Sequence, residues 1–266
     1  MTLLKVAING AGGRMGQRLA AVISGDKELQ LVAALERTGY PQLGADVGLL
    51  AGIGTLGVQV TDSLPENVQP DVVIDFSLPA GAEQVMGLCA ARKIPLVIAT
   101  TGLNEAQLTK LNECSKTIPV VFAPNMSMAV NLTMKLAQLA AKTLANYDAD
   151  VEILERHHRF KVDAPSGTAL KIGQLVANEM GIDHFTHGRQ GILGARPHNE
   201  IAYHAIRTGD NPGEHTVVFG MMGETVEVTV RCSSRDSYAK GACAAAKFLQ
   251  GKIAGLFDMF DVLDLK

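Results

Sequence analysis

Short apolar segments alternate with segments of helical periodicity over residues 1–126. The apolar segments consist mostly of Val, Ile, Leu and Ala, which is typical of parallel strands buried on both faces. The segments between them carry apolar side chains at the three- and four-residue spacing of a helix. This alternation predicts a Rossmann-type, doubly wound parallel sheet with crossover helices, an α/β fold. The expected strands span residues 5–9, 29–35, 71–76, 95–99 and 119–123, and the expected helices span residues 14–23, 79–93 and 104–116.

The pattern is less regular at residues 38–59, which are rich in Gly and Leu, and we expect a loop there with a short strand after it. The period changes at Ser127, whose hydroxyl can cap a long helix that ends near Asn146. Beyond this helix the pattern predicts an α+β unit with a mixed or antiparallel sheet. Its expected elements are a strand at 150–156, a helix from about residue 166, strands at 201–207, 215–221 and 224–232, and a last helix at 238–250. A tight turn at Gly223 and Glu224 predicts that the last two strands form an antiparallel hairpin.

The composition narrows the class of partner. Hydrophobic residues make up 47% and charged residues 19% of the 266 residues, which suits two modest globular domains. Lys and Arg number 24 against 27 Asp and Glu, so the chain lacks the basic surface that nucleic acid or an anionic membrane would require. A small-molecule partner is expected instead.

Cysteine usage and hydropathy predict the compartment. The four cysteines form no C-x-x-C pair, which favours reduced packing residues over metal ligands or disulfides. The first residues enter an apolar strand without a basic leader, and no segment reaches the roughly 18 apolar residues of a membrane span. We therefore expect a cytoplasmic protein.

A glycine-rich turn connects the first expected strand to the first expected helix. Glycines let the backbone approach a pyrophosphate, and the helix N-terminus adds unpaired N–H groups and a partial positive charge. The spacing is G-x-x-G-x-x-G through Gly10, Gly13 and Gly16, because Met15 occupies the third glycine position of the usual motif. We expect a dinucleotide here; the alternative is a turn that serves only close packing. The residues expected to contact it are Gly10, Ala11, Gly12, Gly13, Arg14 and Met15.

Two charged residues end the second expected strand. Glu36 lies where an acidic side chain accepts hydrogen bonds from the adenosine ribose, and Arg37 could hold a 2′-phosphate. The pair predicts a site that tolerates both NADH and NADPH. Two solvated charges at a strand end are the alternative.

Two further loops follow expected strands at the carboxyl edge, where ligands bind in open parallel sheets. The first is small and hydroxylated and suits contact with a nicotinamide riboside, and the second contains an Asn that could anchor the carboxamide. Taken alone, both are explained by turn and helix-cap chemistry, but their joint placement favours a cofactor site. The residues are Ala99, Thr100 and Thr101 in the first loop and Ala123, Pro124, Asn125 and Met126 in the second.

Cationic and titratable side chains concentrate at residues 155–169, just before a helix. His157, His158 and Lys161 can bind carboxylates and donate protons, and the helix that opens at Gly167 and Thr168 suits another carboxylate. A dicarboxylate could be held at both ends. Adjacent histidines and the absence of a nucleophile elbow disfavour a metal site and a serine hydrolase. An exposed basic loop with a capping Ser remains the alternative from chemistry alone.

The same segment carries a family resemblance. Its pattern, Glu-x-His-His-x-x-Lys-x-Asp-Ala-Pro-Ser-Gly-Thr-Ala, closely resembles that of the dihydrodipicolinate reductases. The resemblance extends along essentially the whole chain, through the glycine-rich turn, the Glu36-Arg37 pair, the Thr-Thr-Gly sequence and the closing Gly-Leu-Phe-Asp-Met sequence. Further landmarks are Gly209-Asp210, Gly213-Glu214-His215 and Ser233-Ser234-Arg235.

The resemblance implies hydride transfer from NADH or NADPH to a small cyclic dicarboxylate, with loss of water, in the diaminopimelate route to lysine. His157 would be the acid/base residue and Lys161 the proton donor, while His158, Gly167 and Thr168 would bind substrate carboxylates. The resemblance further implies a dinucleotide-binding domain at 1–126 and 238–266 and a substrate-binding and oligomerisation domain at 127–237 that builds a homotetramer, with hinges near Ser127 and Tyr238.

The chain departs from common family members at a few positions. Phe160 stands where a histidine is frequent, Ala99 where a glycine often precedes Thr-Thr, and Pro124 with Met126 where Ala and an aromatic residue are often seen. Phe160 removes one titratable neighbour of the catalytic pair.

Two other functions compete with the reductase. A phosphorylating semialdehyde dehydrogenase needs a thiolate nucleophile, and none of the four cysteines lies in a polar loop beside a histidine. A non-catalytic dinucleotide sensor would bind the cofactor without needing His157 and Lys161.

Overall fold

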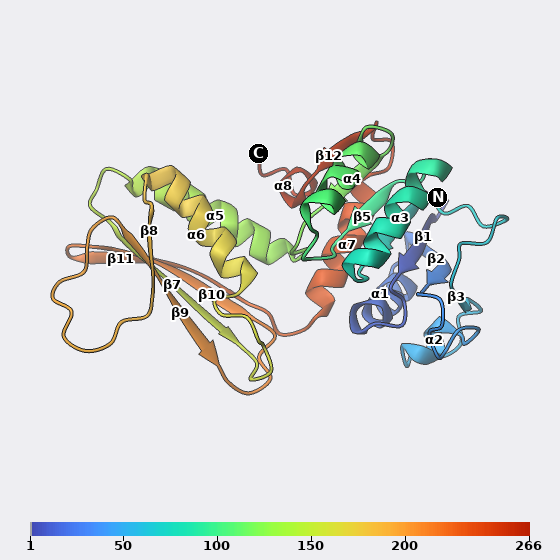
Figure 1. Ribbon diagram of the computed structural model, residues 1–266, viewed down its shortest axis with the longest axis horizontal. Helices are drawn as coiled ribbons and strands as arrows, with labels where there is room; N and C mark the ends of the chain where they lie inside the picture. Colours follow the sequence, from blue (N-terminus) through green and yellow to red (C-terminus); the bar gives the residue numbers. More distant parts are fainter. Residues whose placement is uncertain (1) are drawn as a thin grey trace. The chain divides into compact units, whose positions relative to one another are not determined.

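The computed structural model describes residues 2–266. It divides into two compact units, one formed by Met1–Met128 together with Arg235–Lys266 and the other by Ala129–Ser234 (Figure 1). The first unit therefore combines the beginning and the end of the chain.

The first unit is built on a parallel sheet with the strand order β12-β6-β5-β4-β1-β2-β3. Strand β1 (Leu4–Asn9) pairs in parallel with β2 on one side and β4 on the other. The strand order changes direction between β1 and β4, and the carboxyl ends of all strands meet at one edge. The remaining strands are β2 (Leu29–Leu35), β3 (Val60–Thr61), β4 (Val72–Asp75), β5 (Leu96–Ile98), β6 (Pro119–Phe122) and β12 (Gly255–Phe257).

Alternate side chains of each strand enter separate cores on the two faces of this sheet. Val6 and Ile8 of β1 pack in a cluster with Leu19 and Ile23 of α1, whereas Ala7 joins the opposite cluster. This period of two is expected for a strand covered on both faces. The covering helices are α1 (Arg14–Gly25) and α7 (Asp236–Phe248) for the first cluster and α3 (Pro79–Arg92) and α4 (Glu105–Ser115) for the second. The doubly wound parallel sheet predicted from the sequence is confirmed.

The predicted loop at residues 38–59 contains a short helix that the sequence pattern missed. Helix α2 (Val47–Leu50) is capped by Asp46, whose carboxylate accepts hydrogen bonds from Gly48 N at 2.8 Å and Gly57 N at 2.7 Å. A single helical turn shows no hydrophobic period, so only the capping residue indicates it. Strand β12 and helix α8 (Met259–Val262) were not predicted either, for the same reason of length.

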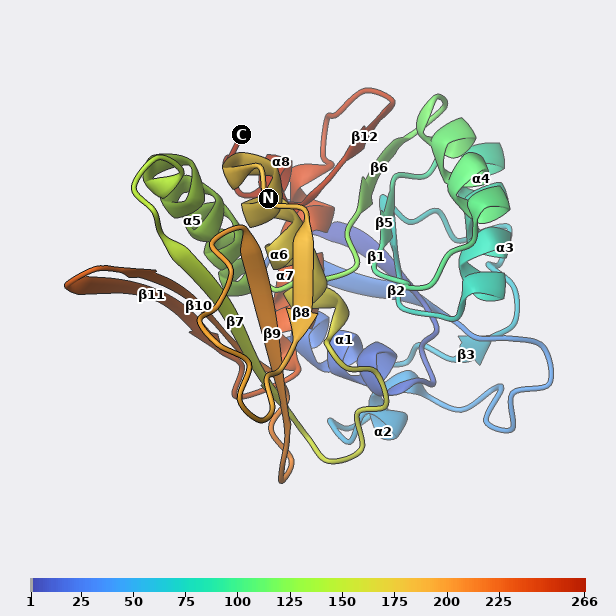
Figure 2. The ribbon, with the colours of Figure 1, turned by 60° about the vertical axis from the view of Figure 1, so that its left-hand side comes forward.

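The second unit contains a mixed sheet with the strand order β11-β10-β7-β9-β8. β10 and β11 form the predicted antiparallel hairpin, with Met221 paired to Glu224. Helices α5 (Met128–Leu144) and α6 (Gly167–Met180) lie on one face of the sheet (Figure 2). Asp150, Glu152 and Arg156 of β7 are less buried than their immediate neighbours along the strand, as expected for side chains on the other face. The strands are β7 (Asp150–His157), β8 (His184–His187), β9 (Glu200–Arg207), β10 (Glu214–Met221) and β11 (Glu224–Arg231), of which β8 was not predicted.

Helix α6 packs on the sheet at very short range. A Cβ added at Gly173 would lie 1.9 Å from the hydroxyl oxygen of Tyr203 on β9. The glycine therefore lets the helix approach the strands that carry the titratable segment. This contact sets the position of the helix N-terminus relative to β7.

Candidate active site

The glycine-rich turn of the first unit is too tightly packed for side chains. Gly10 has φ +83°, and a Cβ there would lie 2.9 Å from Phe76 O. A Cβ at Gly16 would lie 2.2 Å from Gly10 O. The N–H groups of Gly10 and Ala11 both donate to Leu35 O at 2.9 Å, which ties the turn to β2. The sequence thus produces a bare backbone surface at the carboxyl edge of the sheet.

Helix α1 begins directly behind this surface. Gly13 is its N-cap residue, and Gln17 N makes the first helical hydrogen bond, to Gly13 O at 3.0 Å. The N–H groups of Arg14 and Met15 precede that bond and lie at the positive end of the helix. Such N–H groups suit the negative charge of a pyrophosphate.

Glu36 is held against the glycine-rich turn. Its Oε2 accepts a hydrogen bond from Gly12 N at 3.0 Å, and its Oε1 accepts one from Arg37 N at 3.0 Å. The Tyr40 ring packs on the same peptide, since a Cβ at Gly12 would lie 2.3 Å from Tyr40 Cζ. The carboxylate is therefore fixed beside the turn, while the Arg37 side chain is exposed.

The other predicted cofactor residues lie in the loops at 99–101 and 123–126, where some side chains are buried and others are exposed. Ala99 and Thr100 are buried, and the Thr100 hydroxyl donates to Asp75 Oδ2 at 2.6 Å, whereas Thr101 is exposed. In the second loop Met126 is only 1% exposed and belongs to the hydrophobic core, so its backbone alone could meet a ligand.

The loop at 123–126 is shaped by its own side chain and by a helix behind it. Asn125 Oδ1 accepts a hydrogen bond from Ser127 N at 2.9 Å, while Ala123 is buried and Pro124 exposed. A Cβ at Gly241 of α7 would lie 1.7 Å from Met126 O, so the helix packs directly on the loop backbone. The loop is thus held from both sides.

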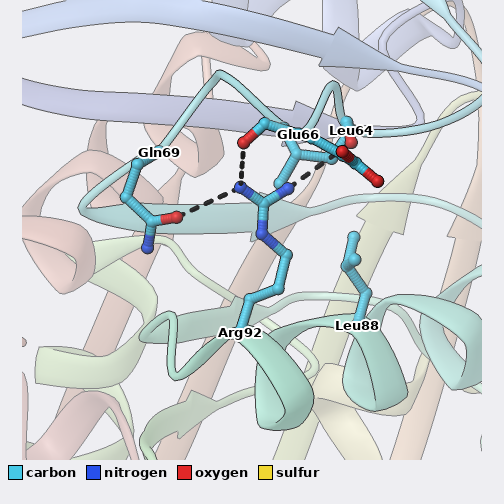
Figure 3. A pocket seen from close by; sticks show the side chains of 5 residues that line it. All are labelled: Leu64, Glu66, Gln69, Leu88 and Arg92. Atoms are coloured by element: carbon cyan, nitrogen blue, oxygen red, sulfur yellow. Dashed lines mark hydrogen bonds between the residues drawn. The ribbon is translucent and has the colours of Figure 1, made fainter.

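A cavity near the opposite edge of the same sheet does not belong to this site (Figure 3). It is lined by Leu64, Glu66, Gln69, Leu88 and Arg92. The Arg92 guanidinium donates to the carbonyl oxygens of Leu64, Pro65, Glu66 and Val68 and to Gln69 Oε1, as Figure 3 shows in part. Arg92 ends α3, which returns the chain to the amino end of β5. Its donors are engaged in holding a loop, and the cavity lies away from the carboxyl ends where ligands bind.

In the second unit, the buried Glu155 on β7 organises the titratable segment. Its Oε2 lies 2.6 Å from His157 Nδ1, and its Oε1 accepts a hydrogen bond from Ser166 N at 3.0 Å. Arg207 of β9 donates to both carboxylate oxygens, at 2.8 and 2.7 Å. One carboxylate therefore joins an imidazole, a guanidinium and the start of a helix.

The protonation of this group follows from its partners. Burial alone would raise the pKa of Glu155, but hydrogen bonds from Arg207 and His157 outweigh it and hold the pKa below its ordinary value. An ionised carboxylate can only accept hydrogen bonds, so His157 Nδ1 carries a proton. Burial lowers the pKa of His157 despite its carboxylate partner, which leaves the ring neutral near pH 7 with the lone pair on Nε2.

Gly213 lies close to His157 Nε2. A Cβ added at Gly213 would lie 3.0 Å from this nitrogen, and Gly213 has φ +153°. A side chain at position 213 would therefore crowd the buried imidazole. The loop is fixed by Cys232 N, which donates to Gly213 O at 2.8 Å.

Lys161 and His158 lie in the turn that follows β7. Lys161 Nζ donates to Asp163 Oδ1 at 2.7 Å, and its positive charge is near enough to lower the pKa of His157. The turn is closed by Lys161 N, which donates to His158 O at 3.1 Å. His158 Nδ1 is buried without a hydrogen-bond partner among the described residues, and Phe160 is 78% exposed. The structure therefore brings His157 and Lys161 together, and it leaves an unused donor or acceptor on His158.

The N-terminus of α6 completes this cluster. Ser166 caps the helix by accepting a hydrogen bond from Ala169 N at 3.2 Å, and its hydroxyl lies 3.0 Å from His215 Nε2. Gly167 and Thr168 are the first helical residues, where backbone N–H groups precede the helical hydrogen bonds. The His215 ring also meets the His157 ring edge-on, with centroids 5.2 Å apart.

Sequence reasoning missed four residues of these two sites as site residues: Asp75, Glu155, Arg207 and His215. Glu155 lies in the titratable segment 155–169 and His215 lies in a landmark of the family resemblance, but neither was predicted to be a site residue. Arg207 lies on a strand that pairs with β7, and such a partner is invisible without the register. An Asp at the end of an apolar strand was the available signal for Asp75.

Comparisons with known proteins identify the family of this chain. The family model described as "Dihydrodipicolinate reductase, N-terminus" matches residues 4–126, and the one described as "Dihydrodipicolinate reductase, C-terminus" matches residues 129–263. The chain belongs to the dihydrodipicolinate reductase family. Two relatives named 4-hydroxy-tetrahydrodipicolinate reductase are similar over nearly their whole length. The Rhodopirellula baltica protein is 49% identical over 98% of this chain and 96% of its own, and the Hahella chejuensis protein is 46% identical over 99% and 100%.

Solved structures extend the family comparison. A dipicolinate-bound dihydrodipicolinate reductase from Paenisporosarcina sp. TG-14 has a TM-score of 0.78 at 27% identity, covering 98% of this chain and 99% of its own. An amine dehydrogenase from Mycobacterium smegmatis has a TM-score of 0.68 at 14% identity, covering 97% of this chain and 95% of its own, which shows a shared fold only. This fold is therefore not confined to the dihydrodipicolinate reductase family.

Three further observations bear on other chemistry. Within residues 2–266, no group of three His, Cys, Asp or Glu side chains is placed to hold a metal ion. Over the same range, no helix has the length and apolarity that crossing a membrane requires. Burial raises the pKa of the thiols of Cys89, Cys114 and Cys243, the last to about 12. Such thiols are poor nucleophiles.

The buried His215 predicts a loss of stability in acid. Burial, followed by the charge of His157, lowers its pKa from 6.5 to about 4. Between these pH values the unfolded chain binds a proton that the folded chain does not, so stability falls as the pH is lowered, by about 3 kcal/mol over the whole interval. Urea unfolding at pH 7 and pH 5 should show about 2 kcal/mol of this loss in the wild type, because pH 5 lies part-way through the interval, and a smaller loss in His215→Gln. His198→Gln, at an 80% exposed side chain in the same unit, should keep the wild-type pH dependence. An equal pH dependence in all three proteins would contradict the assignment.

Proposed function

We propose that this oxidoreductase reduces 4-hydroxy-tetrahydrodipicolinate to tetrahydrodipicolinate, with loss of water, in the diaminopimelate route to lysine. The observation that carries the proposal is the joined cluster of Glu155, His157 and the α6 N-terminus, in a chain that the family models match almost from end to end. Dipicolinate, bound by the relative from Paenisporosarcina, is a cyclic dicarboxylate of the same shape class as the proposed substrate.

The first unit would hold the nicotinamide cofactor. The bare backbone of the glycine-rich turn and the first N–H groups of α1 fit a pyrophosphate, and the anchored Glu36 carboxylate fits a pair of ribose hydroxyls. The bound cofactor supplies the hydride. Thr101 and the backbone of the loops at 99–101 and 123–126 would line the nicotinamide end of the site.

The second unit would bind both carboxylates of the substrate. One carboxylate would meet the N–H groups at Gly167 and Thr168, and the other would meet His158, whose buried Nδ1 lacks a partner among the described residues. The ammonium of Lys161 adds positive charge on the same turn. A ring held at both ends keeps one orientation toward the reacting hydride.

His157 and Lys161 would control the protons. Loss of water and hydride addition to a conjugated imine both change the charge on the ring, so a nearby proton donor and a cation lower the barrier. His157 Nε2 carries the lone pair in the neutral state and can take a proton. Glu155 would stabilise the imidazolium that results and keeps the ring oriented, while Arg207 holds the Glu155 carboxylate in place. Lys161 would donate a proton, with Asp163 as its resting partner.

Two competing functions are disfavoured by particular side chains. Burial raises the pKa of the Cys89, Cys114 and Cys243 thiols, so none of these three suits the thiolate nucleophile that a phosphorylating semialdehyde dehydrogenase requires. A dinucleotide sensor would not need the proton-handling cluster on β7. The reductase accounts for both units.

The purified protein should oxidise NADH or NADPH when supplied with the product of dihydrodipicolinate synthase. Lys161→Ala should lower kcat by about 10²-fold because a proton donor is lost, while cofactor binding stays intact. Lys171→Ala removes an exposed lysine from the same unit and should keep wild-type turnover. A wild type that oxidises neither cofactor would refute the reductase, and full turnover in Lys161→Ala would favour the sensor.

We propose that the protein accepts both NADH and NADPH. In this proposal Glu36 favours NADH and Arg37 favours NADPH. Arg37→Ala should raise the KM for NADPH by about tenfold and leave that for NADH nearly unchanged, since one charge-assisted contact to the 2′-phosphate is lost. Glu36→Ala should raise the KM for NADH more than that for NADPH. Steady-state kinetics with each cofactor measure both effects. Equal changes for the two cofactors in both variants would show that this pair does not read the ribose.

We also propose a homotetramer assembled through the second unit. Helices cover one face of its sheet only, and β11 is an edge strand whose side chains are largely exposed. Met222 and Ile192 are fully exposed apolar side chains near this sheet, as expected of a surface that a second copy covers. Sedimentation should give a mass near four times 28.2 kDa. Met222→Lys with Val226→Lys should lower it, whereas Leu49→Lys in the first unit should not; a wild-type monomer would refute the assembly.

A further inference from the structure

A carboxylate without a cationic partner is buried at the carboxyl edge of the first sheet. Asp75 ends β4 and is 0% exposed. It accepts hydrogen bonds from Asn9 Nδ2 at 2.7 Å, Ser77 Oγ at 2.6 Å and Thr100 Oγ1 at 2.6 Å, and a longer one from Ser77 N at 3.3 Å. The donors come from the ends of β1, β4 and β5, so one side chain joins three neighbouring strand ends.

Filling space in the core does not explain why a carboxylate stands at position 75. Among residues 2–266, no Lys, Arg or His forms an ion pair with Asp75, and burial raises its pKa even though its hydrogen bonds oppose the shift. An apolar residue of similar size would fill the same space in a sheet core without the desolvation that a carboxylate suffers. The role of Asp75 is therefore sought in its position in the fold.

Asp75 lies at the point where the strand order changes direction. Asn9 of β1 is its register partner, and Gly10, the first residue of the glycine-rich turn, follows Asn9 directly. Gly10 in turn packs on the backbone of Phe76, the residue after Asp75. Thr100 belongs to the loop expected to meet the nicotinamide riboside. The hydrogen bonds of Asp75 thus set the spacing between two segments of the proposed cofactor site.

We propose that Asp75 is a positioning residue of the cofactor site, which holds the loops after β1, β4 and β5 in register through Asn9, Ser77 and Thr100. The inference rests on the proposed function of the first unit as the cofactor-binding unit. Asp75 is buried beneath these loops and acts through their geometry, without touching the cofactor. Its removal should therefore weaken cofactor binding more than it changes the chemical step.

The hydrogen-bond inventory predicts which replacement is tolerated. An Asn at this position can accept from Asn9 and Ser77 with its carbonyl oxygen and donate to Thr100 Oγ1 with its amide. The Thr100 hydroxyl then donates to Ser77 O, which already lies 3.2 Å away. Asp75→Asn should keep all three loops joined, whereas Asp75→Ala removes the acceptor altogether.

The experiment compares these variants with a core variant of the same strand. Fluorescence titration of NADH and NADPH without substrate, together with steady-state kinetics, should show both the Kd and the KM for the cofactor raised about tenfold in Asp75→Ala, with kcat at saturation changed by less than about twofold. Asp75→Asn should restore both constants to within about threefold of the wild type. Val73→Ala creates a cavity in β4 without touching the three loops, and it should leave both constants unchanged.

Several outcomes would overturn the inference. Wild-type cofactor affinity in folded Asp75→Ala would do so, as would an Asp75→Asn protein that binds as weakly as Asp75→Ala, because charge rather than loop geometry would then be decisive. If Asp75→Ala does not fold, Ser77→Ala removes one donor and should raise the Kd about threefold; no rise would refute the role. If the wild type binds NADH or NADPH but does not reduce the substrate, the proposed reaction is wrong. The Kd values of the wild type and the Asp75 variants would still test the positioning role.

Discussion

A carboxylate taken out of water needs donors that replace its hydration, and this constraint shapes both units. Glu155 meets it with a guanidinium, an imidazole and a helix N–H, so its pKa is lowered and its charge is retained. Asp75 meets it with an amide, two hydroxyls and a backbone N–H but no cation, so its pKa is raised. In each unit the donors come from separate strands or loops, and the carboxylate sets their mutual positions.

The two carboxylates differ in what their charge can do. A charged Glu155 stabilises a protonated His157, so it can take part in proton transfer through the imidazole it orients. Burial and the positive charges of Lys161 and Arg207 oppose this protonation, because each of them lowers the pKa of His157. The balance of these contacts keeps His157 neutral near pH 7 and still allows it to be charged transiently.

The sequence predicted the elements that are long or periodic and missed those that are short. Six of the seven strands of the first sheet were predicted, from five apolar runs and one short strand, because buried strands leave a continuous apolar signature. The one-turn helix α2 and strands β8 and β12 have too few residues to show a period. In the site, contiguous residues such as His157 and Lys161 could be found from the sequence, since their motif is local. Arg207 could not, because its contact with Glu155 depends on the parallel register of β7 and β9, which only the folded sheet defines.

The order of structural elements within residues 155–169 has a physical reason. Strand β7 ends at His157, the turn carries Lys161, and the helix begins after Ser166, so the chain leaves Glu155 and returns to it within eleven residues. Because Glu155 binds both His157 Nδ1 and Ser166 N, the His157 imidazole and the start of α6 cannot shift independently. Arg207 adds a third link by donating to Asp163 O at 2.7 Å, which fixes the middle of the loop. A loop whose two ends bind the same carboxylate keeps the groups at those ends at a fixed separation. The segment between His157 and Ser166 is such a loop, and a site that holds an anion and moves a proton would require this fixed separation.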